Sequence, residues 1–461
     1  KYVKEYDEKA LKRSINYWDT IRPVPLNPEE TADFIKKDSI EKAKPDTVAK
    51  EKNTVKSFVF RGFRKRITPK SSISTTAIIG INNFNWNTAE GFNYTYGISY
   101  GKKIDEDKRF TSRLLMRYGV SNQQFNAKLS SSYYFGKTNK SQLSLSGGRY
   151  VFQYNNEEPV NELINSAYTL FYGENYFKFY QAWFGNLKYN YRHVSGLTIT
   201  NQLKYQLRNP LFNTNLFSFR KNYKAFTENF PVEKIAGMEP AHKALLYKLS
   251  IRYQPGRKYI KYPDRIVSTS SKYPTFGTSF CLGIPALGSD VNYSKWNVEM
   301  QDDMRLNLWG TFSYKATVGG FLHNKKSYIA DYSHFNGNQI ILASPYMNSF
   351  QLSPYYLNSN TEPFYATLNA EHHFYGMITN KIPLFRRLKW YLVAATNTYY
   401  VNGNNNYVEA SIGLENIGYK LLRFIRVDAV AGYTNFKNPV YGIRIGINSS
   451  VIRLGGGDAE D

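Results

Sequence analysis

The sequence predicts an all-β fold, a closed antiparallel transmembrane β-barrel of about sixteen strands, and three observations support this prediction. Apolar and polar residues alternate along many segments, tyrosine is frequent on the apolar side, and runs of apolar residues are short. Alternation with a period of two is typical of strands with one face in an apolar environment and the other in water.

The alternation is clearest near the end of the chain. Residues 441–448 place Tyr441 and three isoleucines on one face of a strand and Arg444 on the other. A soluble sandwich would fill its apolar face with Val, Leu and Ile, whereas tyrosine suits a membrane interface, because its ring has one apolar and one wet end. The residues expected to face lipid are Tyr94, Tyr96, Ile98, Leu249, Ile251, Ile443, Ile445 and Ile447.

The composition excludes a helical membrane protein. A membrane helix needs about 18 or more consecutive apolar residues, and the apolar runs here, such as residues 390–395, are only a few residues long. The chain nevertheless has 40 Tyr and 30 Phe with a mean hydropathy below zero, which agrees with strands that expose only alternate residues to lipid. Cys281 is the single cysteine, so a disulfide framework is excluded.

Residues 1–70 differ from the rest of the chain and are expected to form a periplasmic linker. They are rich in Lys, Glu, Asp and Pro, with helix-like stretches at 7–16 and 28–44. The chain opens without Met or an export signal, so we expect the native polypeptide to continue upstream.

Residues 71–461 are expected to form the barrel, with both termini periplasmic and with long extracellular loops at 153–180, 209–243 and 322–361. The gap at 255–274 falls on the periplasmic side and is long enough for an extra strand or a plug-like excursion. Strands are predicted at 72–84, 91–102, 108–119, 122–135, 140–152, 181–193, 196–208, 244–254, 275–286, 293–306, 309–321, 362–375, 388–401, 407–416, 422–434 and 440–452.

Several segments resemble a Bacteroidota outer-membrane β-barrel family of unknown function. They are 17–25 (YWDTIRPVP), 362–376 (EPFYATLNAEHHFYG), 380–389 (NKIPLFRRLK) and 409–417 (EASIGLENI). The longer members of that family carry an N-terminal carboxypeptidase-regulatory-like domain. The resemblance implies an outer-membrane location and a barrel, and it implies no activity.

In layout, the chain also resembles the BamA and two-partner-secretion barrel superfamily, through the inferred strand number and a long sixth extracellular loop. In those barrels the loop enters the lumen and carries an Arg-Gly-Phe or Arg-Gly-Tyr tip that pairs with an acidic wall residue. The loop at 322–361 has no such tripeptide, and Arg61-Gly62-Phe63 lies ahead of the first predicted strand. Insertase or translocase activity is therefore not expected of this barrel alone.

Charged residues fall on the polar faces of the predicted strands, so the lumen is expected to be polar. The formal net charge of +24 is spread through loops and strand ends, which favours contact with lipid head groups and lipopolysaccharide over nucleic acid. The predicted lumen charge network is Lys204, Arg208, Lys248, Arg252, Glu371, His373, Glu409, Glu415, Arg426, Asp428 and Arg444.

Catalytic and metal signals are weak, and we expect neither an enzyme nor a bound cofactor or metal. Ser99 lies in a Gly-Ile-Ser-Tyr-Gly match to a nucleophile elbow, but it is predicted in the middle of a strand rather than on a sharp turn. Glu371 and His373 give two inward ligands where a catalytic zinc needs three, so a histidine paired with a wall carboxylate is the favoured interpretation.

The favoured function is a non-catalytic accessory or scaffold subunit in envelope biogenesis, with other outer-membrane proteins or lipoproteins as partners. A gated pore for small solutes and an outer-membrane hydrolase remain alternatives. The loop at 322–361 is too rich in aromatic residues to be solvated, so we expect it to bury them in the barrel mouth or against a partner. These aromatic residues are Tyr328, Tyr332, Phe335, Tyr346, Phe350, Tyr355 and Tyr356.

Overall fold

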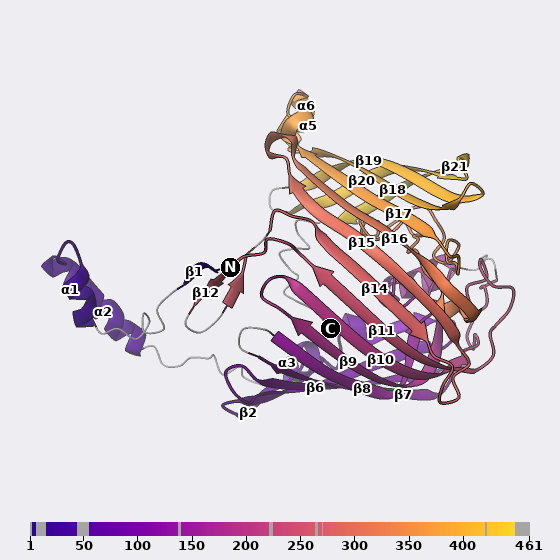
Figure 1. Ribbon diagram of the computed structural model, residues 1–461, viewed down its shortest axis with the longest axis horizontal. Helices are drawn as coiled ribbons and strands as arrows, with labels where there is room; N and C mark the ends of the chain where they lie inside the picture. The colour runs from indigo at the N-terminus through magenta and orange to yellow at the C-terminus, as the bar shows by residue number, and fades with distance from the viewer. Residues whose placement is uncertain are drawn as a thin grey trace.

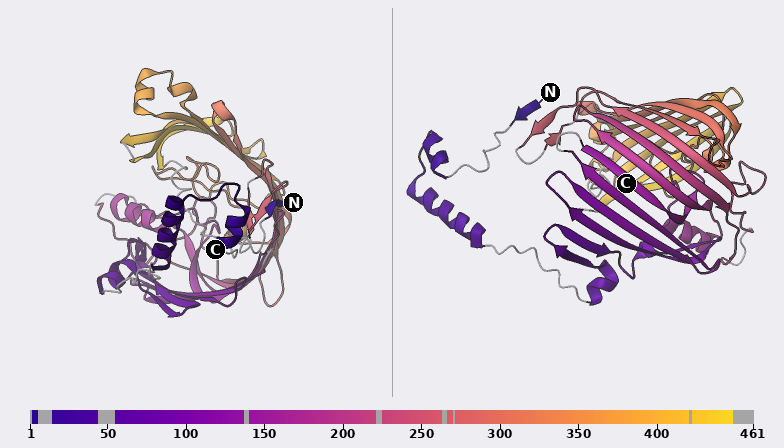
Figure 2. Two further views of the ribbon diagram at one scale, coloured as in Figure 1. Left: turned by 90° about the vertical axis from the view of Figure 1, so that its left-hand side faces the viewer. Right: turned by 60° about the horizontal axis from the view of Figure 1, so that its bottom comes forward.

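The computed structural model describes residues 2–5, 15–43, 55–136, 140–220, 225–262, 266–269, 271–419 and 422–447. Eighteen strands form one large antiparallel sheet that curls round on itself (Figures 1 and 2). The mostly β, antiparallel architecture predicted from the sequence is thereby confirmed. The strands of this sheet are β2 (Arg64–Thr68), β3 (Ser71–Thr75), β4 (Phe84–Asn87), β5 (Gly91–Lys103), β6 (Arg109–Gly119), β7 (Gln124–Phe135), β8 (Lys140–Gln153), β9 (Phe179–Arg192), β10 (Leu197–Pro210), β11 (His242–Tyr253), β14 (Thr275–Gly283), β15 (Asn292–Arg305), β16 (Thr311–Lys326), β17 (Tyr365–Tyr375), β18 (Tyr391–Asn402), β19 (Asn405–Tyr419), β20 (Leu422–Thr434) and β21 (Lys437–Ile447).

The sheet has two strands more than the predicted sixteen, because the first predicted strand, 72–84, is broken into β3 and β4 and because β2 was not predicted. β3 and β4 both pair with β5, one at each end of it, and β2 pairs with the far edge of β3. Between them the chain leaves the ladder after Thr76, whose backbone N–H donates to the Gly97 carbonyl at 2.9 Å. From β5 onward each strand pairs with the next strand of the sheet, up to β21.

The two ends of the sheet are not joined by a strand pairing within the described ranges. β21 pairs with β20 on one side, and its other edge bonds to a loop: the Ala343 N–H donates to the Ile445 carbonyl at 2.8 Å, and the Ile445 N–H donates to the Ile341 carbonyl at 2.9 Å. The left view of Figure 2 shows the yellow end of the sheet at the top and the purple end at the bottom. Residues 448–452 of the last predicted strand lie outside the described residues.

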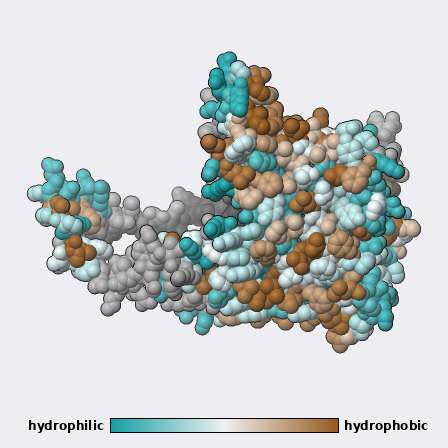
Figure 3. All heavy atoms as spheres, turned by 45° about the horizontal axis from the view of Figure 1, so that its top comes forward, coloured by the Kyte–Doolittle hydropathy of each residue, from teal (hydrophilic) through white to brown (hydrophobic). Residues whose placement is uncertain are grey.

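The outer face of the sheet is rich in exposed apolar and aromatic side chains. Leu145 is 63% exposed, Ile443 is 60% exposed and Trp183 is 56% exposed. Apolar side chains spread in patches across the face seen in Figure 3. The inner face carries buried polar residues such as Asn397 and Glu415. Soluble monomers rarely expose so much apolar surface, so this face needs an apolar environment.

In the N-terminal segment, helices α1 (Ile15–Ile21) and α2 (Pro28–Ala43) stand apart from the main sheet (Figure 1). Helix α3 (Val55–Arg61) lies beside the sheet, and its Val59 carbonyl accepts from the Ile79 N–H at 2.9 Å. A capping box starts α2, because the Asn27 side chain accepts from the Glu30 N–H at 2.8 Å and the Glu30 carboxylate accepts from the Asn27 N–H at 3.0 Å. Residues 7–14 of the first predicted helix lie outside the described residues. No helix in the described ranges is long and apolar enough to cross a membrane.

The connection between β11 and β14 contains extra strands. β12 (Tyr259–Lys261) pairs with β13 (Ile266–Ser268) and, in parallel, with β1 (Tyr2–Glu5), giving a separate three-stranded sheet. The sequence allowed either an extra strand or a plug-like excursion at 255–274, and the structure has the two strands β12 and β13 there. Residues 2–5, predicted to be linker, are therefore part of a sheet.

The three longest connections between sheet strands, 154–178, 211–241 and 327–364, share one end of the curled sheet because neighbouring strands are antiparallel. They contain the helical segments α4 (Glu162–Ala167), η3 (Tyr168–Tyr172) and η5 (Ile329–Asp331). The opposite end carries α5 (Gly376–Thr379) and α6 (Pro383–Leu388) (Figure 1). Two further turns, η2 (Ile81–Asn83) and η4 (Asn307–Trp309), complete the elements.

Candidate functional site

The connection from β16 to β17, residues 327–364, folds into the space enclosed by the sheet, and we call it the plug loop. A solvated loop would expose its aromatic rings, whereas five of the seven rings singled out in the sequence are buried. Tyr328 and Tyr332 are half-buried. The buried rings are Phe335, Tyr346, Phe350, Tyr355 and Tyr356.

The plug loop shares a hydrophobic core with the other two long connections. Tyr356 and Ile329, both fully buried, pack in one cluster with Phe177 and Phe230, which come from the connections 154–178 and 211–241. Polar bonds join the same segments: the Asn155 side chain donates to the Asn336 side chain at 2.7 Å, and the Tyr356 N–H donates to Glu233 at 3.2 Å. The three connections therefore form one packed unit inside the sheet.

A buried ion pair anchors the first half of the plug loop to the wall. The Arg208 Nη1 atom on β10 lies 2.9 Å from the Asp331 Oδ1 atom, and their side chains are 3% and 0% exposed. The Tyr293 hydroxyl donates to the same carboxylate at 3.2 Å. The Lys295 ammonium donates to the carbonyls of Asp331 and Tyr332 at 2.7 and 3.0 Å. The pair is satisfied on both sides, as a buried pair must be to persist.

Glu409 on β19 anchors the second half of the plug loop through the backbone. Its carboxylate accepts from the N–H groups of Gln351 at 2.6 Å and Leu352 at 3.2 Å. The side chains of Asn397 and Tyr407 donate to the same carboxylate, each at 2.9 Å. Four donors on one buried carboxylate hold the loop against β18 and β19.

Arg444 on β21 completes this second anchor. Its Nε atom donates to the Gln351 carbonyl at 2.7 Å, and its Nη2 atom lies 3.4 Å from the Asn338 carbonyl. Together with the backbone bonds at Ile445, these contacts tie the plug loop to the last strand of the sheet.

Five of the predicted lumen residues form one buried network on β17, β19 and β20. The Arg426 guanidinium donates to Glu371 through Nη1 and to Asp428 through Nε, the latter at 2.8 Å. His373 lies between two carboxylates, with Nδ1 3.0 Å from Glu415 and Nε2 3.5 Å from Glu371. No group of three potential metal ligands is arranged to hold an ion in the part of the chain that the structure describes.

The remaining predicted charges lie elsewhere on the inner face. Lys204 and Lys248 line a cavity of about 480 Å³ between the plug loop and the wall. Arg252 pairs with Glu299 of β15 at 3.1 Å. The predicted network is thus divided: Arg208, Glu409 and Arg444 hold the plug loop, and the acidic residues of the late strands hold Arg426.

Arg117 and its partners were missed by the sequence analysis. The Arg117 Nη2 atom on β6 lies 2.5 Å from Glu90, and its Nη1 atom lies 2.8 Å from Glu162 on α4. Arg117 falls on the polar face of a predicted strand, so alternation could have marked it. Glu90, Glu162 and Asp331 lie in connections, where no periodicity indicates which way a side chain points.

Two ionisable groups of the plug region have shifted pKa values. Burial lowers the pKa of His334 to about 3, and nearby Lys295 adds to this effect, so the ring is neutral at pH 7. Burial raises the pKa of Glu239 to about 7. The Glu239 carboxylate accepts from the Ile329 N–H at 2.7 Å, which holds it against the plug loop.

Comparison with solved structures finds outer-membrane proteins. CdiB from Acinetobacter baumannii is 13% identical with a TM-score of 0.35, covering 82% of this chain, and the chain spans 58% of CdiB. BamA from Haemophilus ducreyi, lacking POTRA domains 1–3, is 10% identical with a TM-score of 0.38, over 96% and 84% of the two chains. Wzi from Escherichia coli is 8% identical with a TM-score of 0.32, and the match covers 83% of this chain and 80% of Wzi.

Comparison with curated proteins gives no match. Comparison with family models matches residues 56–414 to the C-terminal domain of a family of unknown function (DUF5686). The match covers the sheet from before β2 into β19, together with the plug loop. The chain therefore belongs to this family of unknown function.

Proposed function

We propose that this chain is an integral outer-membrane β-barrel with a plugged lumen, and that it acts as a non-catalytic accessory or scaffold subunit in envelope biogenesis. In this proposal the chain serves either outer-membrane protein assembly or surface export. The apolar outer face and the polar inner face support the membrane location, because lipid meets only alternate residues of each strand. Lipopolysaccharide and other outer-membrane proteins or lipoproteins are the proposed partners.

The plug loop is the observation that favours a scaffold over a channel. A channel needs a continuous aqueous path, whereas here aromatic rings and buried ion pairs occupy the interior. The plug loop bonds to β10, β19 and β21, so the closed state has contacts around much of the sheet. Release of the plug would break the buried Arg208–Asp331 pair, and this favours the closed state.

An exposed aromatic patch at the plug end supports a protein partner. Phe171 and Phe219 are 61% and 60% exposed, and their rings stack at 5.5 Å. Phe217 packs edge-on against Phe219 at 5.1 Å and against Trp86 at 5.8 Å. Aromatic residues are enriched at protein interfaces, so this patch is a suitable docking surface for a second envelope protein.

A gated pore is the second candidate, and the cavity beneath the plug loop supports it. The cavity of about 480 Å³ is lined largely by polar and charged side chains, which suit water and solutes. In this case a partner or ligand would have to release the Arg208–Asp331 pair before solutes pass.

Single-channel recording distinguishes the two candidates. In planar bilayers the wild-type chain should be electrically silent, and deletion of residues 325–345 should produce steady conductance without unfolding the sheet. Steady conductance of the wild-type chain would favour the pore. An unchanged deletion variant that releases a co-purifying protein would show that the loop is a docking surface and not a plug. Purification from native membranes in mild detergent identifies that protein.

A further inference from the structure

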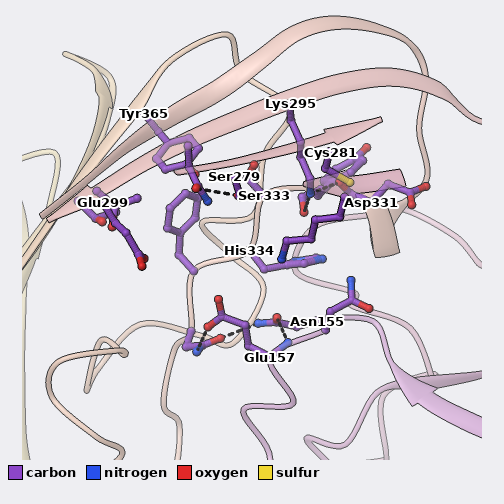
Figure 4. A pocket seen from close by; sticks show the side chains of 18 of the residues that line it. Asn155, Glu157, Ser279, Cys281, Lys295, Glu299, Asp331, Ser333, His334 and Tyr365 are labelled. Carbon is purple, nitrogen blue, oxygen red and sulfur yellow. Dashed lines mark hydrogen bonds between the residues drawn. The ribbon is translucent and has the colours of Figure 1, made fainter. Parts of the chain in front are cut away.

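The cavity beside the plug loop is lined on three sides by parts of the chain that are far apart in the sequence (Figure 4). Strands β10, β11 and β14–β17 supply one side, residues 330–336 of the plug loop supply the facing side, and residues 155–157 supply the third. Its volume of about 480 Å³ lies within the range of about 300–1,000 Å³ that is typical of ligand sites.

The lining is unusual for a ligand site because amides and hydroxyls dominate it. Most small-molecule sites are lined by apolar side chains with a few polar groups. A side-chain amide offers two donors and an acceptor, and a hydroxyl offers both roles. A ligand that matches many such groups must itself carry many hydroxyls. The amides of the lining include Asn155, Asn156, Gln202, Asn297, Asn348 and Asn369.

The cavity also has a cationic excess, because four lysines line it against three acidic groups, Glu157, Glu299 and Asp331. Two of these carboxylates are already paired: Glu299 is held by Arg252 at 3.1 Å, and Asp331 is held by Arg208 at 2.9 Å. In the described part of the chain, no carboxylate forms an ion pair with Lys204 or Lys248. The lining therefore presents two lysine ammonium groups that a ligand anion can neutralise.

Aromatic rings from the plug loop and the wall adjoin this polar surface. Phe335 and Tyr365 both line the cavity, with ring centroids 4.8 Å apart. Figure 4 shows Tyr365 at one side of the cavity, with Lys295 and Asp331 at the other. A flat ring face suits the C–H surface of a sugar ring, while the amides and lysines meet its hydroxyl and acidic groups.

We propose that this cavity binds an acidic saccharide, a hydroxyl-rich chain that carries carboxylate or phosphate groups. Lys204 and Lys248 contact the acidic groups, the amides contact the hydroxyls, and the plug loop forms one face of the site. An inorganic anion would fill only a small part of the cavity. A peptide backbone offers one donor and one acceptor per residue, fewer than the several hydroxyls of each sugar ring. This inference concerns the interior and stands apart from the proposed scaffold function.

Calorimetric titration of the full chain in detergent micelles tests the proposal with three probes: a galacturonic acid hexamer, a neutral maltose-series hexamer, and deacylated lipopolysaccharide core. We expect the galacturonic hexamer or the lipopolysaccharide core to bind, and the tighter of the two indicates whether the natural ligand is a free acidic glycan or a lipopolysaccharide. Higher salt should weaken this binding, because the lysine contacts are electrostatic.

Lys248→Gln is the test variant, because Lys248 is solvent-exposed and its loss should leave the fold intact. It should weaken binding of the acidic probe by about tenfold, the effect of one charge-assisted contact. Lys188→Gln is the matched control, since Lys188 pairs across the sheet with Gln202 on the same face but does not line the cavity. Absence of binding by every probe, equal binding of the neutral hexamer, or an equal loss in the control would overturn the proposal.

Discussion

The two halves of the plug loop are held to the sheet by different chemistry. Residues near Asp331 are held by charged side chains, above all by the buried pair with Arg208 of β10. Residues 338–352 are held mainly through their backbone, by Glu409 of β19 and by Arg444 and Ile445 of β21. The first anchor is centred on one ion pair, with Tyr293 and Lys295 beside it. The second is distributed over several bonds to the plug-loop backbone, which do not depend on the identity of the plug-loop side chains.

Breaking the first anchor should have the largest effect on stability. Asp331→Asn leaves Arg208 buried without its carboxylate, and a buried pair broken on one side costs about 3–5 kcal/mol. Denaturant unfolding and protease cleavage within residues 327–364 measure the effect. The double variant Arg208→Met with Asp331→Leu should recover most of the loss, because no unpaired charge remains. A single variant as stable as the wild type would show that the pair does not anchor the plug.

An outward charge on the strand that carries the second anchor should have the next largest effect. Ile443→Arg places a charge on the outer face of β21, which costs about 2–4 kcal/mol near the bilayer midplane. Ser250→Arg is the control, since Ser250 pairs with Ser279 of the cavity lining and so faces inward. Equilibrium refolding into lipid vesicles measures the unfolding free energy of each of the two variants. Equal losses in the two variants would contradict the assignment of the faces.

Weakening the second anchor at one residue should cost less than breaking the first. Glu409→Gln keeps one oxygen, which serves one plug-loop N–H and one wall side chain, and turns an NH2 group toward the other two donors. The expected cost is about 1–3 kcal/mol. Arg444 and the β21 backbone bonds remain. Hydrogen exchange at residues 338–352 measures the local effect. A loss equal to that of Asp331→Asn would show that the second anchor is not distributed.

The smallest expected effect is a pH dependence in which two groups oppose each other. The pKa of Glu239 is raised to about 7 from 4.5, so its contribution to stability is lost as pH rises from about 4.5 to 7. The pKa of His334 is lowered to about 3 from 6.5, so its contribution is lost as pH falls below about 6.5. Between pH 4.5 and 6.5 the contributions of these two groups to the unfolding free energy should largely cancel in the wild type.

Single variants should separate these two slopes. In the Glu239→Gln variant, the unfolding free energy should fall as the pH is lowered from 6.5 to 4.5, because only the His334 contribution remains. In the His334→Asn variant it should rise over the same range, because only the Glu239 contribution remains. If the unfolding free energies of the wild type and of both variants depended on pH in the same way, neither group would have a pKa that changes on folding.

Alternation predicted most of the wall, because each strand from β5 to β21 has one lipid-suited face and one polar face. The same pattern predicted one strand where the structure has β3 and β4, because the residues between them do not interrupt the hydrophobic pattern. For the site, alternation identified Glu409, Arg426 and Arg208 as inward residues. It could not identify Asp331, because the direction of a side chain in a loop is set by packing at a distance.

The joint core of the three long connections has a consequence for the order of folding. Asn155 and Asn336 are 181 residues apart in the sequence, so their bond closes a loop that contains most strands of the sheet. Contacts of such long sequence separation form slowly, because the chain between them must first be ordered. We therefore expect the plug to assemble last, after a stage in which the strands are paired and the interior is still open.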